Sequence, residues 1–341
     1  MKLLPSIAAC LLAFSSTGWS AAEPDPQMKA VLDELAALNP KPLAGLSPKE
    51  ARKQPTPADA VASLMKKQHK KGPEPVRDVD NASVTLGDHK VPVRIYTPKG
   101  KGPFPVILYI HGGGWVIADL DTYDASPRAL CNAANAIVVS THYRQAPEAK
   151  FPAAHQDVFG VYGWVVKNEG RRNYDSKKIA VVGESAGGNM AAAVSMMAKE
   201  QGMQLPLYQV LVYPVSDVTK MDTPSYGENA EAKPLNKAMM EWFGKHTLAQ
   251  PDDARNPRLS LVLAGDELKG MPPTTIILAQ IDPLRSEGEK LAELLQQAGV
   301  KVNLKTYAGV THEFFGMAAV LDKAREAQAV VAADLKAAFG Q

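Results

Sequence analysis

The chain has 341 residues, a formal net charge of +2 and two cysteines. A charge so close to balance gives no electrostatic basis for binding nucleic acid or an anionic membrane surface. The length is compatible with two domains, but α/β folds keep chains of this size around one core.

The first 22 residues have the pattern of a secretory signal peptide. Lys2 precedes an apolar segment at residues 3–14, and small residues up to Ala22 suit cleavage there. The segment is too short for a transmembrane helix, and no later apolar run reaches the length of about 18 residues that a span needs. We therefore expect a periplasmic or secreted protein without stable membrane insertion.

One of the two cysteines lies in the predicted signal peptide and the other lies after it. Residues 7–10 resemble a lipoprotein cleavage box, but too few apolar residues precede Cys10 for lipid anchoring to be the favoured interpretation. Removal of the signal peptide leaves Cys131 as the only cysteine. An intramolecular disulfide is then excluded, although export would permit one.

Residues 23–77 have a helical character and precede the first strand signals. Apolar residues recur at helical spacing between Met28 and Leu38, and the sequence SPKE at residues 47–50 matches a helix start with a capping box. We interpret this segment as the N-terminal part of a helical cap over a catalytic domain at residues 78–341. The basic run at residues 66–71 is explained by a solvated helix face, with anionic-lipid binding as the alternative.

Strand and helix patterns alternate through the remaining chain, which predicts a mostly parallel sheet covered by helices on both faces. Between strand and helix signals, residues 218–253 form a polar, helix-prone insertion that we assign to a second part of the cap. The predicted strands cover residues 83–86, 91–96, 106–110, 136–141, 179–182, 208–213, 274–278 and 302–307, and the predicted helices cover residues 121–134, 151–167, 287–298 and 323–339.

A glycine-rich loop, HGGGW at residues 111–115, follows the strand at residues 106–110 directly. Successive glycines let backbone amides approach a ligand without obstruction by side chains, which suits an oxyanion hole. We therefore predict Gly112 and Gly113 as oxyanion-hole donors. The alternative is a flexible glycine loop beside a packed tryptophan.

The strand at residues 179–182 runs through Gly-x-Ser-x-Gly at residues 183–187 into an alanine-rich helix. Strand, sharp turn and helix form the context of a nucleophile elbow, in which a strained turn exposes the serine hydroxyl at the carboxyl end of a strand. This context predicts Ser185 as a nucleophile. The amide of Ala186, which follows the nucleophile, is the third predicted oxyanion donor.

An acid and a base follow two later strands. Asp282 comes after the strand that begins at residue 274, and His312 comes after the strand at residues 302–307. Asp282 alone could cap a helix, and His312 alone could be a surface histidine. Their chain order after Ser185 is nevertheless the order of an α/β-hydrolase triad, and their joint placement after separate strands favours a catalytic role.

Together these motifs resemble the bacterial hormone-sensitive-lipase-like family of α/β-hydrolase esterases over about residues 24–340. The resemblance implies an α/β-hydrolase fold with a helical cap, no metal, no organic cofactor, and a loop-shaping role for His111. The remaining histidines also lack the spacing of a zinc site. The matching segments are residues 111–115, 143–148, 151–154, 183–189 and 282–285, and His312.

Three positions depart from the family pattern. Glu184 replaces a frequent aspartate before the nucleophile, and Ser286 replaces an aspartate after Arg285. Glu313 stands where glycine is common. None of these changes removes a triad member, so we expect them to affect substrate preference more than activity.

We therefore expect a serine carboxylic-ester hydrolase that forms an acyl-enzyme, and the resemblance implies short- to medium-chain acyl esters. The alternatives are an amidase or sugar-ester deacetylase on the same triad, or a hydrolase-like protein that binds a ligand without turnover. The expected partner is a small-molecule ester, and the oligomeric state stays open, with a homodimer among the alternatives. Candidates for lining the pocket are Trp115, Tyr213, Met239, Met240, Trp242 and Phe243, with core packing as an equal explanation for each.

Overall fold

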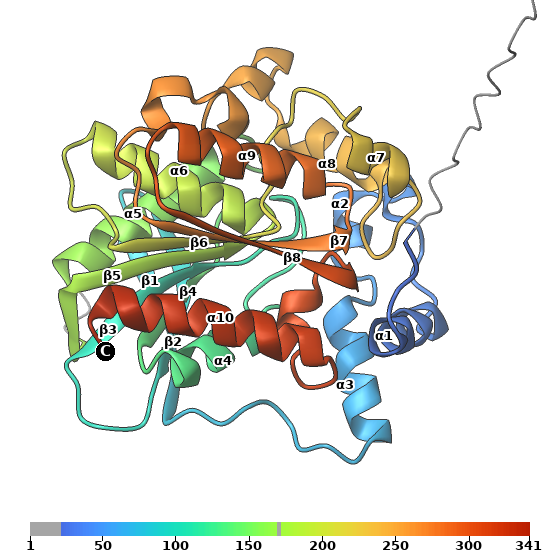
Figure 1. The fold of residues 1–341 in the computed structure, drawn as a ribbon, viewed down its shortest axis with the longest axis horizontal. Helices are drawn as coiled ribbons and strands as arrows, with labels where there is room; N and C mark the ends of the chain where they lie inside the picture. The colour runs from blue at the N-terminus through green and yellow to red at the C-terminus, as the bar shows by residue number, and fades with distance from the viewer. Residues whose placement is uncertain (1–21, 169–171) are drawn as a thin grey trace, which may run out of the picture.

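The computed structural model describes residues 22–168 and 172–341 (Figure 1). The predicted signal peptide, including Cys10, lies outside the described residues apart from Ala22. In the described part of the chain, no helix combines the length and the apolar character needed to cross a bilayer.

The described residues form one eight-stranded sheet in the order β1-β2-β4-β3-β5-β6-β7-β8. The pairs β1–β2 and β2–β4 are antiparallel, and every pair from β4 to β8 is parallel. This arrangement confirms the predicted mostly parallel sheet of an α/β-hydrolase. The strands are β1 (Asp78–Leu86), β2 (His89–Thr97), β3 (Phe104–Ile110), β4 (Ile137–Thr141), β5 (Tyr174–Glu184), β6 (Tyr208–Val212), β7 (Thr274–Ile281) and β8 (Val302–Thr311).

Helices cover both faces of this sheet (Figure 1). The covering helices are α4 (Ala125–Ala133), α5 (Ala153–Lys167), α6 (Ala186–Glu200), α9 (Arg285–Gln297) and α10 (Asp322–Phe339). All residues of β3 are buried, and alternate residues face different layers. Tyr109 joins the core beneath α4 and α10, whereas Leu108 joins the core beneath α5, α6 and α9. Burial on both faces explains the continuous apolar sequence of this strand.

The helix predicted at residues 121–134 begins four residues later, at Ala125. The carboxylate of Asp119 accepts hydrogen bonds from the amides of Asp121 and Thr122 at 3.0 and 2.9 Å. These amides are therefore engaged in a turn held by an aspartate, which competes with helix formation.

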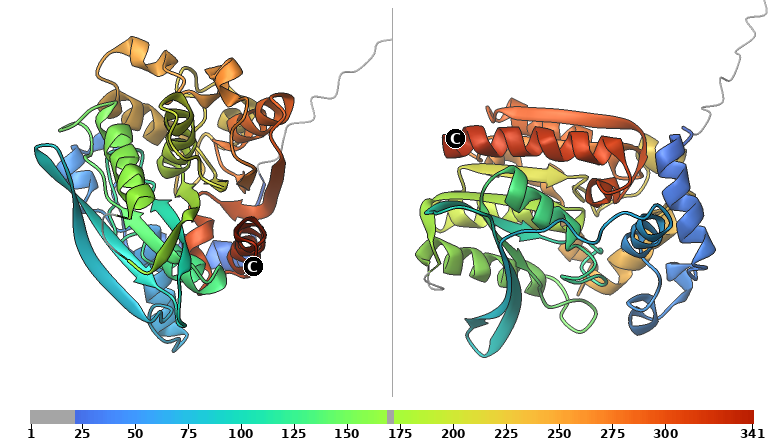
Figure 2. Two further views of the ribbon diagram at one scale, coloured as in Figure 1. Left: turned by 90° about the vertical axis from the view of Figure 1, so that its left-hand side faces the viewer. Right: turned by 90° about the horizontal axis from the view of Figure 1, so that it is seen from below.

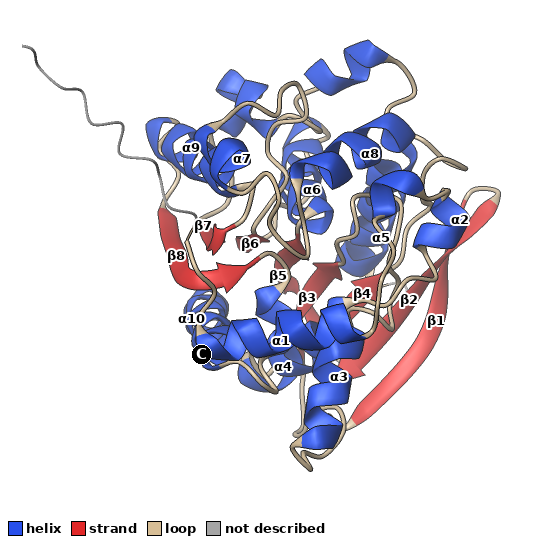
Figure 3. Ribbon diagram, turned by 90° about the vertical axis from the view of Figure 1, so that its right-hand side faces the viewer, coloured by secondary structure: helices blue, strands red, loops and turns tan. Residues whose placement is uncertain are grey.

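The two segments predicted as a cap lie near the carboxyl ends of the parallel strands (Figures 2 and 3). The first contains α1 (Pro26–Ala37), α2 (Pro48–Ala51) and α3 (Pro57–Lys67), and the second contains α7 (Pro224–Glu228) and α8 (Lys237–Thr247). The predicted capping box of Ser47 and Glu50 is present at the start of α2. The indole Nε1 of Trp242 on α8 donates to the carbonyl of Leu46 at 3.0 Å, which joins the two segments.

Candidate active site

Ser185 lies in a sharp turn between β5 and α6. Its φ of 58° and ψ of −120° are unusual for a residue with a side chain. A Cβ added to Gly187 would lie 2.7 Å from the carbonyl carbon of Ile110 and closer still to its oxygen. Only glycine therefore lets α6 pack this closely against β3, and this contact holds the turn in place.

The loops after β5, β7 and β8 bring Ser185, His312 and Asp282 together. The Ser185 hydroxyl lies 3.0 Å from Nε2 of His312, and Nδ1 of His312 lies 2.6 Å from a carboxylate oxygen of Asp282. The other oxygen of Asp282 accepts from the amide of Leu284 at 2.9 Å, which fixes the carboxylate. The three residues are 5%, 3% and 1% exposed, so water screens this hydrogen-bonded chain only weakly.

The environment of His312 favours its protonated form. Burial alone would lower the pKa of the imidazole, but the negative charge and hydrogen bond of Asp282 outweigh burial and raise this pKa above its ordinary value. Asp282 also accepts from Nδ1, which leaves Nε2 of the neutral ring as the nitrogen that accepts the serine proton.

The glycine loop lies against the nucleophile. A Cβ added to Gly112 would lie 3.1 Å from Cβ of Ser185, so the loop backbone contacts the serine directly. Gly113 has a φ of 92°, a conformation that suits glycine. Ala186 is the first residue of α6, and amides in the first turn of a helix lack acceptors within that helix. The loop and the helix start thus meet at Ser185.

His111 holds this loop through a hydrogen bond. Its Nδ1 donates to the carbonyl of Gly112 at 2.9 Å, and the hydroxyl of Tyr143 donates to the same carbonyl at 2.9 Å. Burial lowers the pKa of His111 to about 3, so the ring is neutral at ordinary pH. The position of His111 is consistent with a loop-shaping residue and places it away from proton transfer.

Charged residues of the matching segments connect the core with the cap segments. Arg52, beside α2, forms an ion pair with Glu148 at 2.7 Å and donates to the carbonyls of Val116 and Ala146 at 2.8 Å each. The hydrogen bond from Arg52 lowers the pKa of Glu148 to about 2. Arg285 forms an ion pair at 2.6 Å with Glu228 on α7. These motifs therefore position the cap segments rather than the reacting atoms.

A cavity of about 1080 Å³ opens beside the triad and reaches beneath α3. Its lining includes apolar side chains from α3 together with polar groups near Ser185. Among the lining residues are Val61, Ala62, Met65, Gly113, Ile117, Ala118, Tyr123, Glu184, Glu313 and Met317. A cavity of this size that combines apolar and polar side chains suits a small organic molecule.

Trp115 and Tyr213, two of the candidates for lining the pocket, are absent from the lining of this cavity. They are 3% and 0% exposed and pack in the core. The hydroxyl of Tyr213 donates to Glu184, and the centroid of its ring lies 4.4 Å from that of His312. Tyr213 therefore packs against this histidine from within the core. Of the described residues that line the cavity, none is among the other four candidates, Met239, Met240, Trp242 and Phe243.

Two glutamates with tyrosine partners lie beside the triad. Glu184 is fully buried and accepts from the hydroxyl of Tyr109 at 2.5 Å. Glu313 accepts from the hydroxyl of Tyr123 at 2.6 Å. Burial raises the pKa of Glu184 to about 7, and it also raises the pKa of Glu313. Both glutamates depart from the family pattern, and their tyrosine partners could not be predicted from the sequence.

The described residues contain no group of three or more histidine, cysteine, aspartate or glutamate side chains that could hold a metal ion. Cys131, in α4, is a buried free thiol, and burial raises its pKa to about 12.

Comparison with protein families gives a match to a model described as the alpha/beta hydrolase fold, over residues 107–316. The matched range contains the glycine loop, the turn at Ser185, Asp282 and His312.

Curated relatives include several ester hydrolases. The carboxylesterase NlhH of Mycobacterium tuberculosis is 36% identical over 83% of this chain and 91% of its own length. The ethyl acetate hydrolase of Pseudomonas putida is 32% identical over 85% of this chain and 90% of its own length. The carboxylic ester hydrolase LipN of Mycobacterium tuberculosis is 37% identical over 72% of this chain, which spans 66% of LipN.

Solved esterase structures also resemble the chain. A hyperthermophilic esterase from Pyrobaculum calidifontis gives a TM-score of 0.84 at 35% identity, covering 92% of this chain and 98% of that one. A thermostable esterase from Pseudomonas putida gives a TM-score of 0.84 at 30% identity, covering 93% and 98%. The likeness thus extends over the sheet and the surrounding helices.

Proposed function

The chain belongs to the hormone-sensitive-lipase-like family of α/β-hydrolases and is a carboxylesterase, and from this premise we propose that it cleaves short- to medium-chain acyl esters with Ser185 as nucleophile. The observation that carries the proposal is the hydrogen-bonded chain from the Ser185 hydroxyl through His312 to Asp282, with distances of 3.0 and 2.6 Å.

The proposed mechanism follows from proton transfer along this chain. A serine hydroxyl is a weak nucleophile at neutral pH, so His312 accepts its proton as the oxygen attacks the ester carbonyl. Asp282 holds the imidazole in the required tautomer and stabilises the imidazolium. His312 then protonates the leaving alcohol, and water cleaves the resulting acyl-enzyme by the same steps.

Backbone amides stabilise the negative charge that develops on the carbonyl oxygen. We assign this role to the amides of Gly112, Gly113 and Ala186, which belong to the loop and the helix start that meet at Ser185. Loss of one such donor costs on the order of 3 kcal/mol in comparable enzymes. These amides are therefore as important to the proposal as the triad side chains.

The preference for short and medium acyl chains is supported by the name of one relative, and the cavity has room for such a substrate. A 32% identical relative is named ethyl acetate hydrolase. The acyl group of ethyl acetate has two carbons. The cavity beside Ser185, at about 1080 Å³, accommodates a small ester together with its alcohol part.

Hydrolysis of p-nitrophenyl esters from acetyl to palmitoyl tests the proposal. We expect turnover that falls sharply beyond medium chains, and we expect Ser185→Ala to reduce kcat by at least about 10⁴-fold, because the substitution removes the nucleophile. Stoichiometric labelling of Ser185 by a phosphonate would separate a catalyst from a binding protein. Wild-type activity in a folded Ser185→Ala protein would refute the serine mechanism.

A further inference from the structure

Glu313 occupies an unusual backbone conformation directly after the catalytic histidine. Its φ of 72° lies in the left-handed region, which residues with a Cβ rarely adopt. Glycine would adopt this conformation without strain. The side chain of Glu313 is therefore the feature that needs an explanation.

The carboxylate of Glu313 faces the reacting side of the histidine. One oxygen, Oε1, lies 3.8 Å from Nε2 of His312, the nitrogen that faces the Ser185 hydroxyl. The same oxygen accepts from the Tyr123 hydroxyl at 2.6 Å, which holds the carboxylate in this place. The side chain is 22% exposed and lines the cavity, so solvent and substrate reach it.

Tyr123 is part of the same arrangement. A Cβ added to Gly112 would clash with its hydroxyl oxygen and would lie 3.1 Å from Cβ of Ser185. The hydroxyl of Tyr123 therefore lies between the glycine loop and Glu313, next to the nucleophile.

The distance between Nε2 and Oε1 suits a bridging water molecule. A single water about 2.8 Å from each atom can bridge acceptors that are 3.8 Å apart, and it donates one hydrogen to each. An alcohol has only one O–H group. It can donate to Nε2 of His312 but then has no hydrogen left for Glu313.

We propose that Glu313, held by Tyr123, positions the water that hydrolyses the acyl-enzyme and thereby favours water over alcohols as the acyl acceptor. This inference rests on the serine mechanism proposed above. Glu313 is a positioning residue, because it accepts a hydrogen bond throughout and takes up no proton.

The deacylation step balances with water as the only added reactant. The water oxygen bonds to the acyl carbonyl carbon, and one of its protons passes to Nε2 of His312. The other hydrogen stays covalently on that oxygen and donates a hydrogen bond to Glu313. The tetrahedral intermediate then collapses, and the bond between the carbon and Oγ of Ser185 breaks. His312 returns the proton to Oγ, and the carboxylic acid leaves.

Competition between water and methanol for the acyl-enzyme tests the inference. With p-nitrophenyl butyrate and a fixed methanol concentration, the ratio of butyric acid to methyl butyrate reports the choice of acceptor, whereas kcat/KM for p-nitrophenol release reports acylation. We expect Glu313→Gly to lower the acid-to-ester ratio about tenfold, the effect of one hydrogen bond to a charged group. At a pH above the acid limb of the profile, where His312 is neutral in both proteins, kcat/KM should change by less than about twofold. The melting temperature should not fall, because glycine relieves the backbone strain.

Two further variants sharpen this experiment. Tyr123→Phe removes the hydroxyl that holds the carboxylate, so it should lower the same ratio with Glu313 still present. Glu326→Gln, at an exposed position on α10, removes a carboxylate that does not line the cavity and should leave the ratio unchanged.

An unchanged acid-to-ester ratio in folded Glu313→Gly would overturn the inference. Equal losses of acylation and of both products, at a constant ratio, would also overturn it, because they would mean that Glu313 acts only through the charge of His312. Failure of the serine mechanism is seen separately, as turnover that survives Ser185→Ala.

Discussion

His312 must be neutral to accept the proton of Ser185, so its pKa determines the acid limb of the pH profile. Burial acts to lower this pKa, but Asp282, Glu313 and Glu184 raise it above 6.5. We therefore expect kcat/KM to increase with pH through a midpoint above 6.5, since the protonated ring below that midpoint is inactive. The measurement is kcat/KM for p-nitrophenyl butyrate across the pH range in which the protein stays folded.

Replacement of Glu313 by glycine provides the control for this midpoint. The variant removes one of the negative charges that raise the pKa of His312, so the acid limb should move to lower pH. A wild-type midpoint at or below the ordinary histidine value of about 6.5 would contradict the predicted direction.

At the residue scale, the meeting of three side chains could be predicted, because each follows a recognisable strand. Parallel strands place their carboxyl ends along one edge, so Ser185, Asp282 and His312 meet there. The contact between Tyr123 and Glu313 could not be predicted in this way. Tyr123 lies in a turn held by Asp119, and such a turn leaves no periodic pattern from which its side-chain direction follows.

Among the secondary-structure elements, the contact between α6 and β3 sets the geometry of the nucleophile turn. Gly187→Ala would force its Cβ into the carbonyl group of Ile110, which is backbone and cannot rotate away. We expect this substitution to lower the free energy of unfolding by about 3 kcal/mol. Urea denaturation, followed by circular dichroism, measures the change.

Gly163→Ala is the matched control on α5. Its added Cβ would meet only Cε of Met203, at 3.9 Å, and the position lies inside a helix. Alanine should therefore raise the free energy of unfolding by about 0.5–1 kcal/mol. A similar stability change in the two variants would show that the close contact of α6 with β3 is unimportant.

The sheet could be predicted at this scale because its central strands are continuously apolar and separated by helical patterns. The start of α4 could not, because the side chain of Asp119 takes up backbone amides that a helix would otherwise use. Local competition of this kind depends on the rotamer of one side chain, which composition and periodicity do not reveal.

At the scale of the whole molecule, the two cap segments meet through few polar contacts. The hydrogen bond from Trp242 to the carbonyl of Leu46 is one of them. Trp242→Phe keeps the aromatic packing but removes this bond, which is worth about 1 kcal/mol. We expect amide exchange at Ala51 and Arg52 on and after α2 to accelerate about fivefold, as measured by hydrogen–deuterium exchange, while the sheet remains protected.

Trp164→Phe serves as the comparison, because Trp164 is a partly buried tryptophan on α5, within the catalytic core. It should leave exchange in α2 unchanged. Equal exchange at Ala51 in wild type and Trp242→Phe would show that other contacts hold the first cap segment.

The position of α8 explains why its apolar residues do not line the cavity. The apolar residues of α8 are spaced to bury one helix face, but the sequence does not show whether that face meets the core or the cavity. Phe243 packs against Gly114 of the glycine loop, so this face is used for structure. The cavity is lined instead by α3 and by the loop that contains Tyr123.

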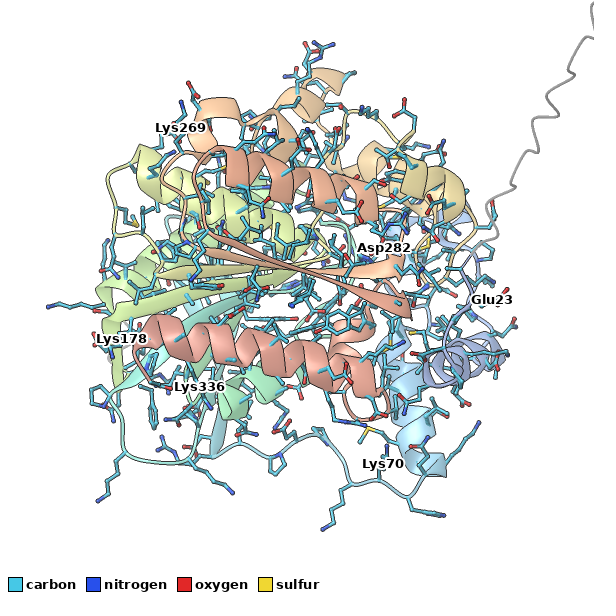
Figure 4. The ribbon with its side chains drawn as sticks, viewed as in Figure 1. Glu23, Lys70, Lys178, Lys269, Asp282 and Lys336 are labelled. Carbon is cyan, nitrogen blue, oxygen red and sulfur yellow. The ribbon has the colours of Figure 1, made fainter. Side chains whose placement is uncertain are left out.

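The two ends of the described chain lie at different distances from the triad, which matters if the enzyme is attached to a solid support. The amide of Asp25 donates to the carbonyl of Gly309 at 2.8 Å, three residues before His312. The carbonyl of Phe339 instead accepts from Lys178 at 2.7 Å, seven residues before Ser185 along β5, or about 20 Å away at the usual rise per residue. Figure 4 shows Glu23 and Asp282 on one side and Lys178 and Lys336 on the other. A support linked at the C-terminal end would therefore hold the enzyme on the side of the sheet away from Asp282, whereas attachment at Glu23 would hold it on the same side as Asp282 (Figure 4).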